Sequence, residues 1–195
     1  MLYLNDKLFD FDLSAALDLL SEQRREQALR FKHELGQRTA VAAYILLCEG
    51  LRKEFGICEK PVFGYEEHGK PYLIGHEDIH FNISHCREAA ACYISRQPVG
   101  IDIESIRPLK RALVEYTMNE EEQRMIFDST DQERAFTRLW TQKEALLKLT
   151  GQGIRDNLKN ALRRNDVVLS THETPSYIYT ICQYCTSSGI DAISE

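Results

Sequence analysis

The sequence predicts an α+β fold, because helical and strand-like segments follow one another in blocks along the chain. Apolar residues at helical spacing mark three segments: 12–29, 37–55 and 131–150. Short runs with the pattern of strands mark five more: 79–84, 89–95, 99–104 and two within 166–184. This order of helices, strands, helices and strands also permits two similar halves that meet near Pro98.

The two longest helical segments have clear stop signals. Alanines and large aliphatic residues fill 37–55, which is therefore expected to be a well-buried helix that ends at Gly56. Gly151 and Gly153 follow the 131–150 segment and are expected to close it, because glycine adopts the left-handed conformation common at helix ends.

Two shorter helical regions are also predicted. The 12–29 segment has a helical apolar pattern followed by a charged turn. Asn119 and Glu122 have the spacing of a capping box, in which each side chain accepts a hydrogen bond from the other residue's backbone. This spacing predicts a helix that runs through Phe127.

The strand segments are joined by short links. Polar residues 85–88 separate the first two strands, and 96–98 separate the second from the third, which favours an antiparallel meander. The two C-terminal strands are expected to join through Thr174-Pro175.

Composition restricts the function classes. A hydrophobic fraction of 43% and a charged fraction of 28% are typical of a globular protein. The net charge of -6 argues against a general nucleic-acid binder. The longest apolar run, 40–48, is too short to span a membrane, and charged residues interrupt the N-terminal stretch before a signal peptide could form. A cytoplasmic protein with no nucleic-acid or membrane partner is expected.

The six cysteines indicate neither disulfides nor a metal site. Only Cys182 and Cys185 form a CxxC pair, and they lie in a predicted strand, where residues three apart point to opposite faces. Reduced thiols, several of them in the core, are therefore expected.

A local basic segment, 24–38, stands out in this acidic chain. It contains five cations against two acids: Arg24, Arg25, Arg30, Lys32 and Arg38, with Glu26 and Glu34. Such a segment either binds a phosphorylated ligand or forms a solvated helix face, and charge alone favours the solvated face.

The first candidate site is the strand 99–104. Asp102 and Glu104 share one face of this strand, while the isoleucines between them face the other. Neighbouring carboxylates repel each other unless a cation lies between them or water screens them, and hard oxygen ligands of this kind suit magnesium. The alternative is a half-exposed strand whose acids face solvent.

The second candidate site is the helix segment 136–148. Apolar residues form a stripe with Lys143 in its middle, and a lysine there must snorkel to solvent or find a buried partner. Glu144 lies at the edge of the stripe, and Lys148 follows it one turn later. A simple surface ion pair between Glu144 and Lys148 is the alternative.

Two shorter motifs complete the set. Ser84 and His85 end a strand and could donate to a phosphate or contact a base, but neighbours in sequence cannot easily act as nucleophile and base. Lys70 and Pro71 follow Gly69 in a turn that says little about function by itself.

Taken in order, these motifs resemble the 4′-phosphopantetheinyl transferases of the surfactin-synthetase type. The resemblance rests on four blocks with matching spacing, which cover about two thirds of the chain together with the similar basic stretch 21–38: Gly69-Lys70-Pro71, 81–85, 99–104 and 140–153. One block alone is weak evidence, whereas four in order are specific. The family's middle-helix start is replaced here by Met118-Asn119-Glu120, and Gln27 stands where relatives often have a second basic residue.

The resemblance implies a fold of two similar α+β lobes related by a pseudo-two-fold axis. The lobes would be 1–98 and 99–195, with the transferase domain spanning about 70–185 and coenzyme A bound between the lobes. It implies transfer of phosphopantetheine from coenzyme A to a serine of an apo acyl or peptidyl carrier protein, by a monomer that needs Mg²⁺.

The resemblance also implies roles for particular residues. The magnesium ligands would be Asp102, Glu104 and Glu144. Residues that contact coenzyme A would be the following: Arg24, Arg38, Lys70, Pro71, Ser84, His85 and Lys148. Because the nucleophile belongs to the carrier, the chain needs a base and a cation for the leaving group. Glu144 is the expected base, with Glu104 as the alternative, and Lys148 is the expected cation.

Three other functions are weighed against this one. A non-catalytic coenzyme A binder would be expected to have lost one of the three acids, and all are present. A magnesium-dependent phosphohydrolase leaves the Gly69-Lys70-Pro71 and Ser84-His85 motifs unexplained. A purely structural interaction module is hard to reconcile with Lys143 on an apolar stripe. The physiological carrier and the preference for Mg²⁺ over Mn²⁺ stay open.

Overall fold

The computed structural model describes residues 1–151 and 158–185 of the 195-residue chain. Its helices are as follows: α1 Leu13–Leu19, α2 Glu22–Leu29, α3 Glu34–Phe55, α4 Arg111–Thr117, α5 Glu120–Phe127, α6 Gln132–Thr150 and the 3₁₀ helix η1 Leu158–Arg163. Its strands are as follows: β1 Leu2–Asn5, β2 Phe63–Tyr65, β3 Pro71–Leu73, β4 His80–His85, β5 Ala90–Ser95, β6 Val99–Ser105, β7 Val167–Glu173 and β8 Tyr177–Tyr184.

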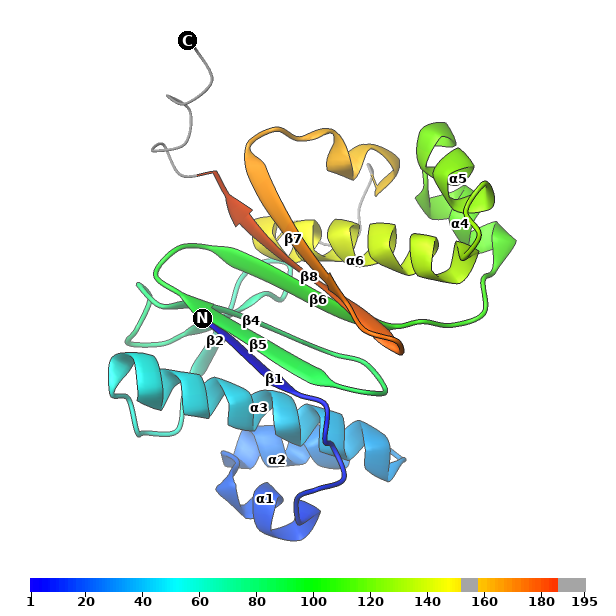
Figure 1. Cartoon of the computed structure of the whole chain (residues 1–195). Coiled ribbons are helices and arrows are strands. Elements are labelled where there is room, and N and C mark those ends of the chain that lie inside the picture. The colour runs from blue at the N-terminus through cyan, green and yellow to red at the C-terminus, as the bar shows by residue number, and fades with distance from the viewer. Residues whose placement is uncertain (152–157, 186–195) are drawn as a thin grey trace.

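Two small antiparallel sheets lie next to each other between helical layers (Figure 1). The first has the order β1-β5-β4 and packs against α3, with α1 and α2 on the far side of that helix. The second has the order β6-β8-β7 and packs against α6. A separate hairpin, β2-β3, completes the strands of the described ranges. The α+β class predicted from the sequence is confirmed.

The seam between the two sheets is made by side chains of β4. Asn82 Oδ1 accepts a hydrogen bond from the backbone N–H of Ile101 at 3.0 Å, and Ser84 Oγ accepts one from that of Ile103 at 3.3 Å. β6 therefore pairs with β8 and not with β5. The predicted meander is correct for β4 and β5 and wrong for the third strand, because side chains occupy the backbone donors on this side of β6.

The predicted helix ends are confirmed where the structure describes them. Gly56 and Gly151 close α3 and α6 in the left-handed conformation, each with φ of 70°. The capping box of Asn119 and Glu122 is complete in both directions at the start of α5. Gly153 lies outside the described residues.

The segment 12–29 is two helices and not one. Ser21 adopts an extended conformation, and its hydroxyl accepts a hydrogen bond from the backbone N–H of Arg24, so that a new helix begins there. The sequence patterns also missed several short elements: β1, β2, β3, α4 and η1. Each has seven residues or fewer, which is too short for a periodic pattern to be distinctive.

Lys143 has the buried partner that its position on an apolar stripe requires. Its side chain is 0% exposed, and Nζ donates to Glu122 Oε2 at 2.7 Å. The same ammonium donates to the carbonyl oxygens of Thr117 at 3.1 Å and Leu158 at 2.8 Å. Lys143 therefore ties α4, α5 and η1 to α6, and the capping residue Glu122 has two structural tasks.

The cysteines agree with the expectation of reduced thiols. All six are free. Cys182 is buried in β8, whereas Cys185 lies just after the end of this strand and is exposed. Among the helices of the described ranges, none combines the length and the apolar character that crossing a membrane requires.

Candidate active site

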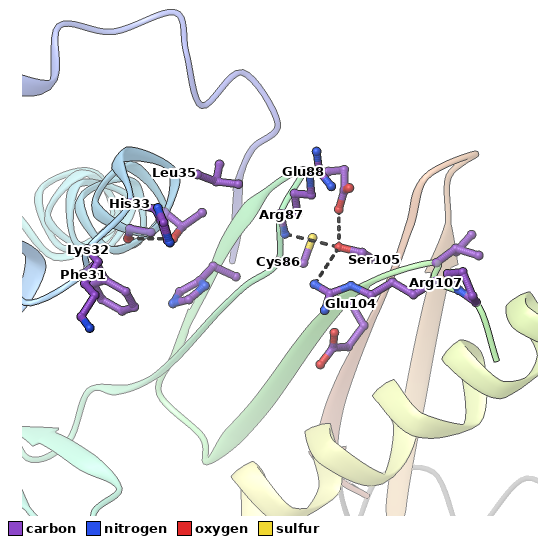
Figure 2. Close-up of a pocket in the computed structure, with 15 residues that line it drawn as sticks. Phe31, Lys32, His33, Leu35, Cys86, Arg87, Glu88, Glu104, Ser105 and Arg107 are labelled. Atoms are coloured by element: carbon purple, nitrogen blue, oxygen red, sulfur yellow. Dashed lines mark hydrogen bonds between the residues drawn. The ribbon is translucent and has the colours of Figure 1, made fainter. Parts of the chain in front are cut away.

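Three carboxylates meet where β6 packs against α6. Asp102 is 3% exposed and Glu104 is half-buried, both on the same face of β6. Glu144 lies half-buried on α6. The carboxylate of Glu104 points from β6 toward α6 (Figure 2), and the charge of Asp102 acts on both other acids. The strand and the helix thus bring together acids that are 42 positions apart in the sequence.

Lys148 forms its ion pair with Asp102 and not with Glu144. Its Nζ lies 2.7 Å from Asp102 Oδ1 and donates to Ser84 Oγ at 2.8 Å. The Ser84 hydroxyl in turn donates to Asp102 Oδ1 at 3.0 Å. The surface pair between Glu144 and Lys148, which was the alternative from sequence, is absent from the ion pairs of the described residues. One oxygen of Asp102 is therefore surrounded by donors.

Two buried carboxylate oxygens have no hydrogen-bond partner in the described part of the chain: Asp102 Oδ2 and Glu144 Oε1. A buried charged oxygen without a partner is costly, so such atoms indicate a cation or water in the functional state. Magnesium commonly binds to one or two carboxylates and completes its shell with water and phosphate oxygens.

These oxygens fit that kind of site better than a closed protein cage. Within residues 1–151 and 158–185, no three His, Cys, Asp or Glu side chains are arranged to hold one metal ion. A magnesium ion at Asp102 and Glu144 would therefore need ligands from water or substrate.

Burial and mutual repulsion raise the pKa values of the two less buried acids. The pKa of Glu144 rises to about 7, first because of burial and next because of the charge of Asp102, while Lys148 acts in the opposite direction. Burial, followed by the charge of Asp102, also raises the pKa of Glu104. Repulsion of this kind is expected where carboxylates share a site that lacks a cation.

The raised pKa of Glu144 predicts a pH-dependent stability defect in the metal-free protein. The folded protein keeps this proton up to a pH of about 7, whereas the unfolded chain releases it near the ordinary value of 4.5. The folded state therefore loses stability as the pH rises through this interval, and the loss is complete above it. Glu144→Gln should raise the thermal unfolding temperature at pH 8 in EDTA and leave it nearly unchanged at pH 5.

A control for this measurement is Glu133→Gln, which removes an exposed carboxylate from the first turn of the same helix. It should not stabilise the protein at pH 8. If Glu144→Gln gave no stabilisation at pH 8, the proposed repulsion among the acids would be wrong.

A cavity of about 250 Å³ opens beside Glu144 and Lys148. Lys70, in the turn after β2, and Pro71, at the start of β3, also line it, so that motifs more than 70 residues apart share one space. Lys70 Nζ donates to the carbonyl oxygen of Leu149 at 2.8 Å, and burial lowers the pKa of this lysine. The cavity thus combines two lysines with an acid.

A second, larger cavity of about 920 Å³ lies between the start of α3 and the end of β6 (Figure 2). Glu104 and His85 both line it. Burial lowers the pKa of His85, and the positive charge of Lys148 adds to this effect. His85 therefore lies near a basic part of the site.

The larger cavity also contains basic residues that sequence reasoning did not single out: His33, Arg87 and Arg107. Figure 2 shows Arg87 and Arg107 around Ser105, whose hydroxyl accepts from the backbone N–H of Arg87 at 3.3 Å. The nearness of Arg107 to Asp102 and Glu104 in the sequence was an available signal. Arg87 had a similar signal, because it follows the candidate residue His85 by two positions, whereas His33 had none, since only the fold brings it to β6.

Arg24 and Arg38 are not among the residues that line these two cavities. The guanidinium of Arg24 lies over the ring of Phe63 at 4.0 Å. That of Arg38 donates to the carbonyl oxygens of Leu8 at 3.1 Å and Phe11 at 2.8 Å. The structure therefore brings together the other predicted residues around β4, β6 and α6, while these two arginines have contacts within the N-terminal half.

Comparison with known proteins agrees with this arrangement. Residues 98–189 match the family model of the 4′-phosphopantetheinyl transferase superfamily. The chain is 29% identical to the 4′-phosphopantetheinyl transferase psf-1 of Bacillus pumilus, over 91% of this chain and 80% of the relative. It is 26% identical to the 4′-phosphopantetheinyl transferase Sfp of Bacillus subtilis (strain 168), over 92% of this chain and 84% of the relative. It is 32% identical to HetI of Nostoc, a 4′-phosphopantetheinyl transferase, over 73% of this chain and 63% of the relative.

The fold and the site define an α+β protein whose carboxylates and a lysine come together where β6 packs against α6. By these matches the chain is similar to the 4′-phosphopantetheinyl transferases: the family model covers just under half of it, and its matches over 80% or more of a relative's length are to psf-1, Sfp and ffp, each named as such a transferase.

Proposed function

We propose that this protein transfers the 4′-phosphopantetheine group of coenzyme A to a serine of an apo acyl or peptidyl carrier protein and releases adenosine 3′,5′-bisphosphate. The observation that carries the proposal is the pair of unpartnered buried oxygens on Asp102 and Glu144, next to the ammonium of Lys148. A diphosphate needs both a divalent cation and protein cations at its binding site, and this cleft offers groups for each. The match of residues 98–189 to the family model of the superfamily supports the same activity.

The metal in this proposal is Mg²⁺, held by Asp102, Glu104 and Glu144 together with oxygens of water and substrate, because in the described residues the three acids do not by themselves form a metal site. The open oxygens of Asp102 and Glu144 support this choice, as does the repulsion that raises the pKa of Glu104. When bound, the ion would neutralise charge on the diphosphate of coenzyme A.

The chain's own residues supply the proton transfer. In the reaction, the serine oxygen of the carrier forms a bond to the phosphorus next to the pantetheine, and the bond from that phosphorus to the leaving bisphosphate breaks. Glu144 takes the serine proton, directly or through water, with Glu104 as the alternative base. Lys148 neutralises the charge that develops on the leaving group.

Coenzyme A would lie across the seam between the sheets. Lys70, Pro71, Ser84 and His85 would contact its adenine and 3′-phosphate end, and Lys148 its diphosphate. The shared cavity of Lys70, Pro71 and Lys148 supports this placement. Arg24 and Arg38 would add positive charge from the N-terminal half.

The proposal includes the finer architecture. Residues 1–98 and 99–195 would form two similar lobes related by a pseudo-two-fold axis, with the transferase domain at about 70–185. The packing of one small sheet on one long helix in each half supports this division. We expect a cytoplasmic monomer whose partners are coenzyme A and a carrier protein, without nucleic acid or membrane.

Intact-mass spectrometry of the carrier tests the function. The purified protein is incubated with coenzyme A, Mg²⁺ and each of several apo carriers from fatty-acid, polyketide and peptide synthesis. At least one carrier should gain the mass of one phosphopantetheine, and its variant with alanine at the modified serine should gain none. No mass change in any carrier would overturn the proposed activity. If coenzyme A also stayed intact, the alternative function as a carrier-independent phosphohydrolase would be overturned as well.

A further inference from the structure

Lys148 lies next to a carboxylate that is proposed to bind a divalent cation. Its Nζ lies 2.7 Å from Asp102 Oδ1, in a site where the side chain of Asp102 is 5% exposed and that of Lys148 is 28% exposed. An ion pair with so little access to water is weakly screened. The ammonium thus provides Asp102, Glu104 and Glu144, here called the acid cluster, with positive charge before any metal binds.

The two carboxylate oxygens of Asp102 differ in their contacts. Oδ1 is bonded to Lys148 Nζ and to the hydroxyl of Ser84 at 3.0 Å. Oδ2 has no partner in the described part of the chain. A cation that binds at the buried Oδ2 would meet a carboxylate whose charge is already largely balanced by Lys148.

We propose that Lys148 is a built-in counter-ion of the acid cluster, which weakens the binding of a divalent cation alone and makes the binding of the cation and coenzyme A cooperative. This inference rests on the proposed function, because the group that would draw the ammonium away from Asp102 is the diphosphate of coenzyme A. Lys148 is here a regulatory residue of the metal site, in addition to its proposed role at the leaving group.

The physical reason is a competition between two electrostatic partners of one ammonium. Without a diphosphate, a divalent cation at Asp102 and Glu144 lies close to the Lys148 charge and is repelled by it. A bound diphosphate attracts the ammonium, which leaves more negative charge at Asp102 for the metal. Because linkage is reciprocal, the metal must then increase the affinity for coenzyme A by the same factor.

Calorimetric titration with Mn²⁺ alone, in the absence of coenzyme A and carrier, tests the first half of the inference. Lys148→Met keeps the aliphatic stem and removes the charge. It should bind Mn²⁺ about tenfold more tightly than the unchanged protein, within the usual range of coupling between sites. Equal or weaker binding by Lys148→Met would overturn the inference.

The matched control is Lys70→Met, which removes a positive charge from the same cavity. Lys70 Nζ donates to the carbonyl oxygen of Leu149 and to no acid of the cluster. Its loss should change the Mn²⁺ affinity by less than about threefold, because it does not free a carboxylate. An equal gain in both variants would mean general charge reduction and would overturn the role given to the pair of Lys148 with Asp102.

The second half is tested through the fluorescence of Trp140, the only tryptophan of the chain, whose side chain acts on the pKa of Glu104. Coenzyme A is titrated with and without saturating Mn²⁺. The metal should tighten coenzyme A binding in the unchanged protein, and by a smaller factor in Lys148→Met. An undiminished factor would overturn the cooperative role.

These measurements separate the inference from the proposed function. Tighter Mn²⁺ binding by Lys148→Met together with no carrier modification would sink the transferase proposal and leave the counter-ion role standing. Carrier modification by the unchanged protein, together with an Mn²⁺ affinity of Lys148→Met equal to that of the unchanged protein, would support the transferase proposal and overturn the counter-ion role. If Lys148→Met does not keep the thermal unfolding temperature of the unchanged protein, Lys148→Gln, which retains a polar group toward Ser84, is measured in its place with the same expected gain.

Discussion

Glu144→Gln should abolish phosphopantetheine transfer while the protein remains folded. The substitution keeps the shape of the side chain and removes both the charge for the metal and the base for the carrier serine. We expect kcat/KM to fall by at least about 10²–10³-fold, the scale for losing one group that stabilises charge in a transition state. The same variant should be more stable than the unchanged protein at pH 8, because the pKa of Glu144, raised to about 7 by burial, makes its ionised form unfavourable there.

Asp102→Asn should have the same effect on transfer. Asparagine is the right replacement, because Asp102 is 3% exposed and alanine would leave a cavity beside Lys148 and Ser84. Transfer is measured by the mass of the carrier, and folding by the thermal unfolding temperature. Glu133→Gln, on the exposed first turn of α6, serves as the control and should transfer normally.

Full activity in either folded variant would contradict the assignment of the acid cluster. It would mean that neither the metal nor the base depends on the carboxylate that was removed. The combination of higher stability and lost transfer in Glu144→Gln is especially informative, because a variant that is inactive through misfolding would be less stable.

Gly100→Ala should strongly destabilise the protein. A Cβ at this position of β6 would overlap the carbonyl oxygen of Ala145 and come within 2.5 Å of the backbone nitrogen of Leu149. Both atoms belong to the backbone of α6, so no side-chain rotation relieves the clash. We expect a loss of about 3 kcal/mol or more in the free energy of unfolding, at the upper end for an overpacked site.

Urea unfolding of Gly100→Ala and Gly56→Ala side by side checks this result. Gly56 has φ of 70°, and a methyl group at its Cα would meet no atom within 4 Å, so its replacement carries only the cost of the left-handed conformation, about 1–2 kcal/mol. Transfer should also fall in Gly100→Ala, because separating β6 from α6 moves Asp102 away from Glu144. Equal losses of stability in the two variants would show that the contact of β6 with α6 is not close.

Much of the local structure could be predicted from short sequence signals. Asn119 and Glu122 predict the start of α5 because a capping box needs only residues three positions apart. Gly56 and Gly151 predict helix ends for an equally local reason. The shared face of Asp102 and Glu104 follows from the alternation of a strand. The candidate acids could therefore be named from the sequence alone.

Contacts between distant segments could not be predicted in the same way. The third strand of the expected meander pairs with β8, because side chains of Asn82 and Ser84 take its backbone donors on one side. Arg38 lies in the basic segment expected to bind coenzyme A, yet it donates to carbonyl oxygens of Leu8 and Phe11. No local pattern indicates either partner.

The sequence by itself determined the resemblance to a known family, the class of fold, the ends of the long helices and the set of candidate site residues. Only the tertiary structure decided that Lys148 pairs with Asp102 instead of Glu144, and that Glu144 has a pKa of about 7. The physical reason is the separation along the chain of the residues that interact. Helix caps, turns and strand faces depend on neighbours in the chain, whereas burial and electrostatic interaction depend on which distant elements pack together, and here that is β6 against α6.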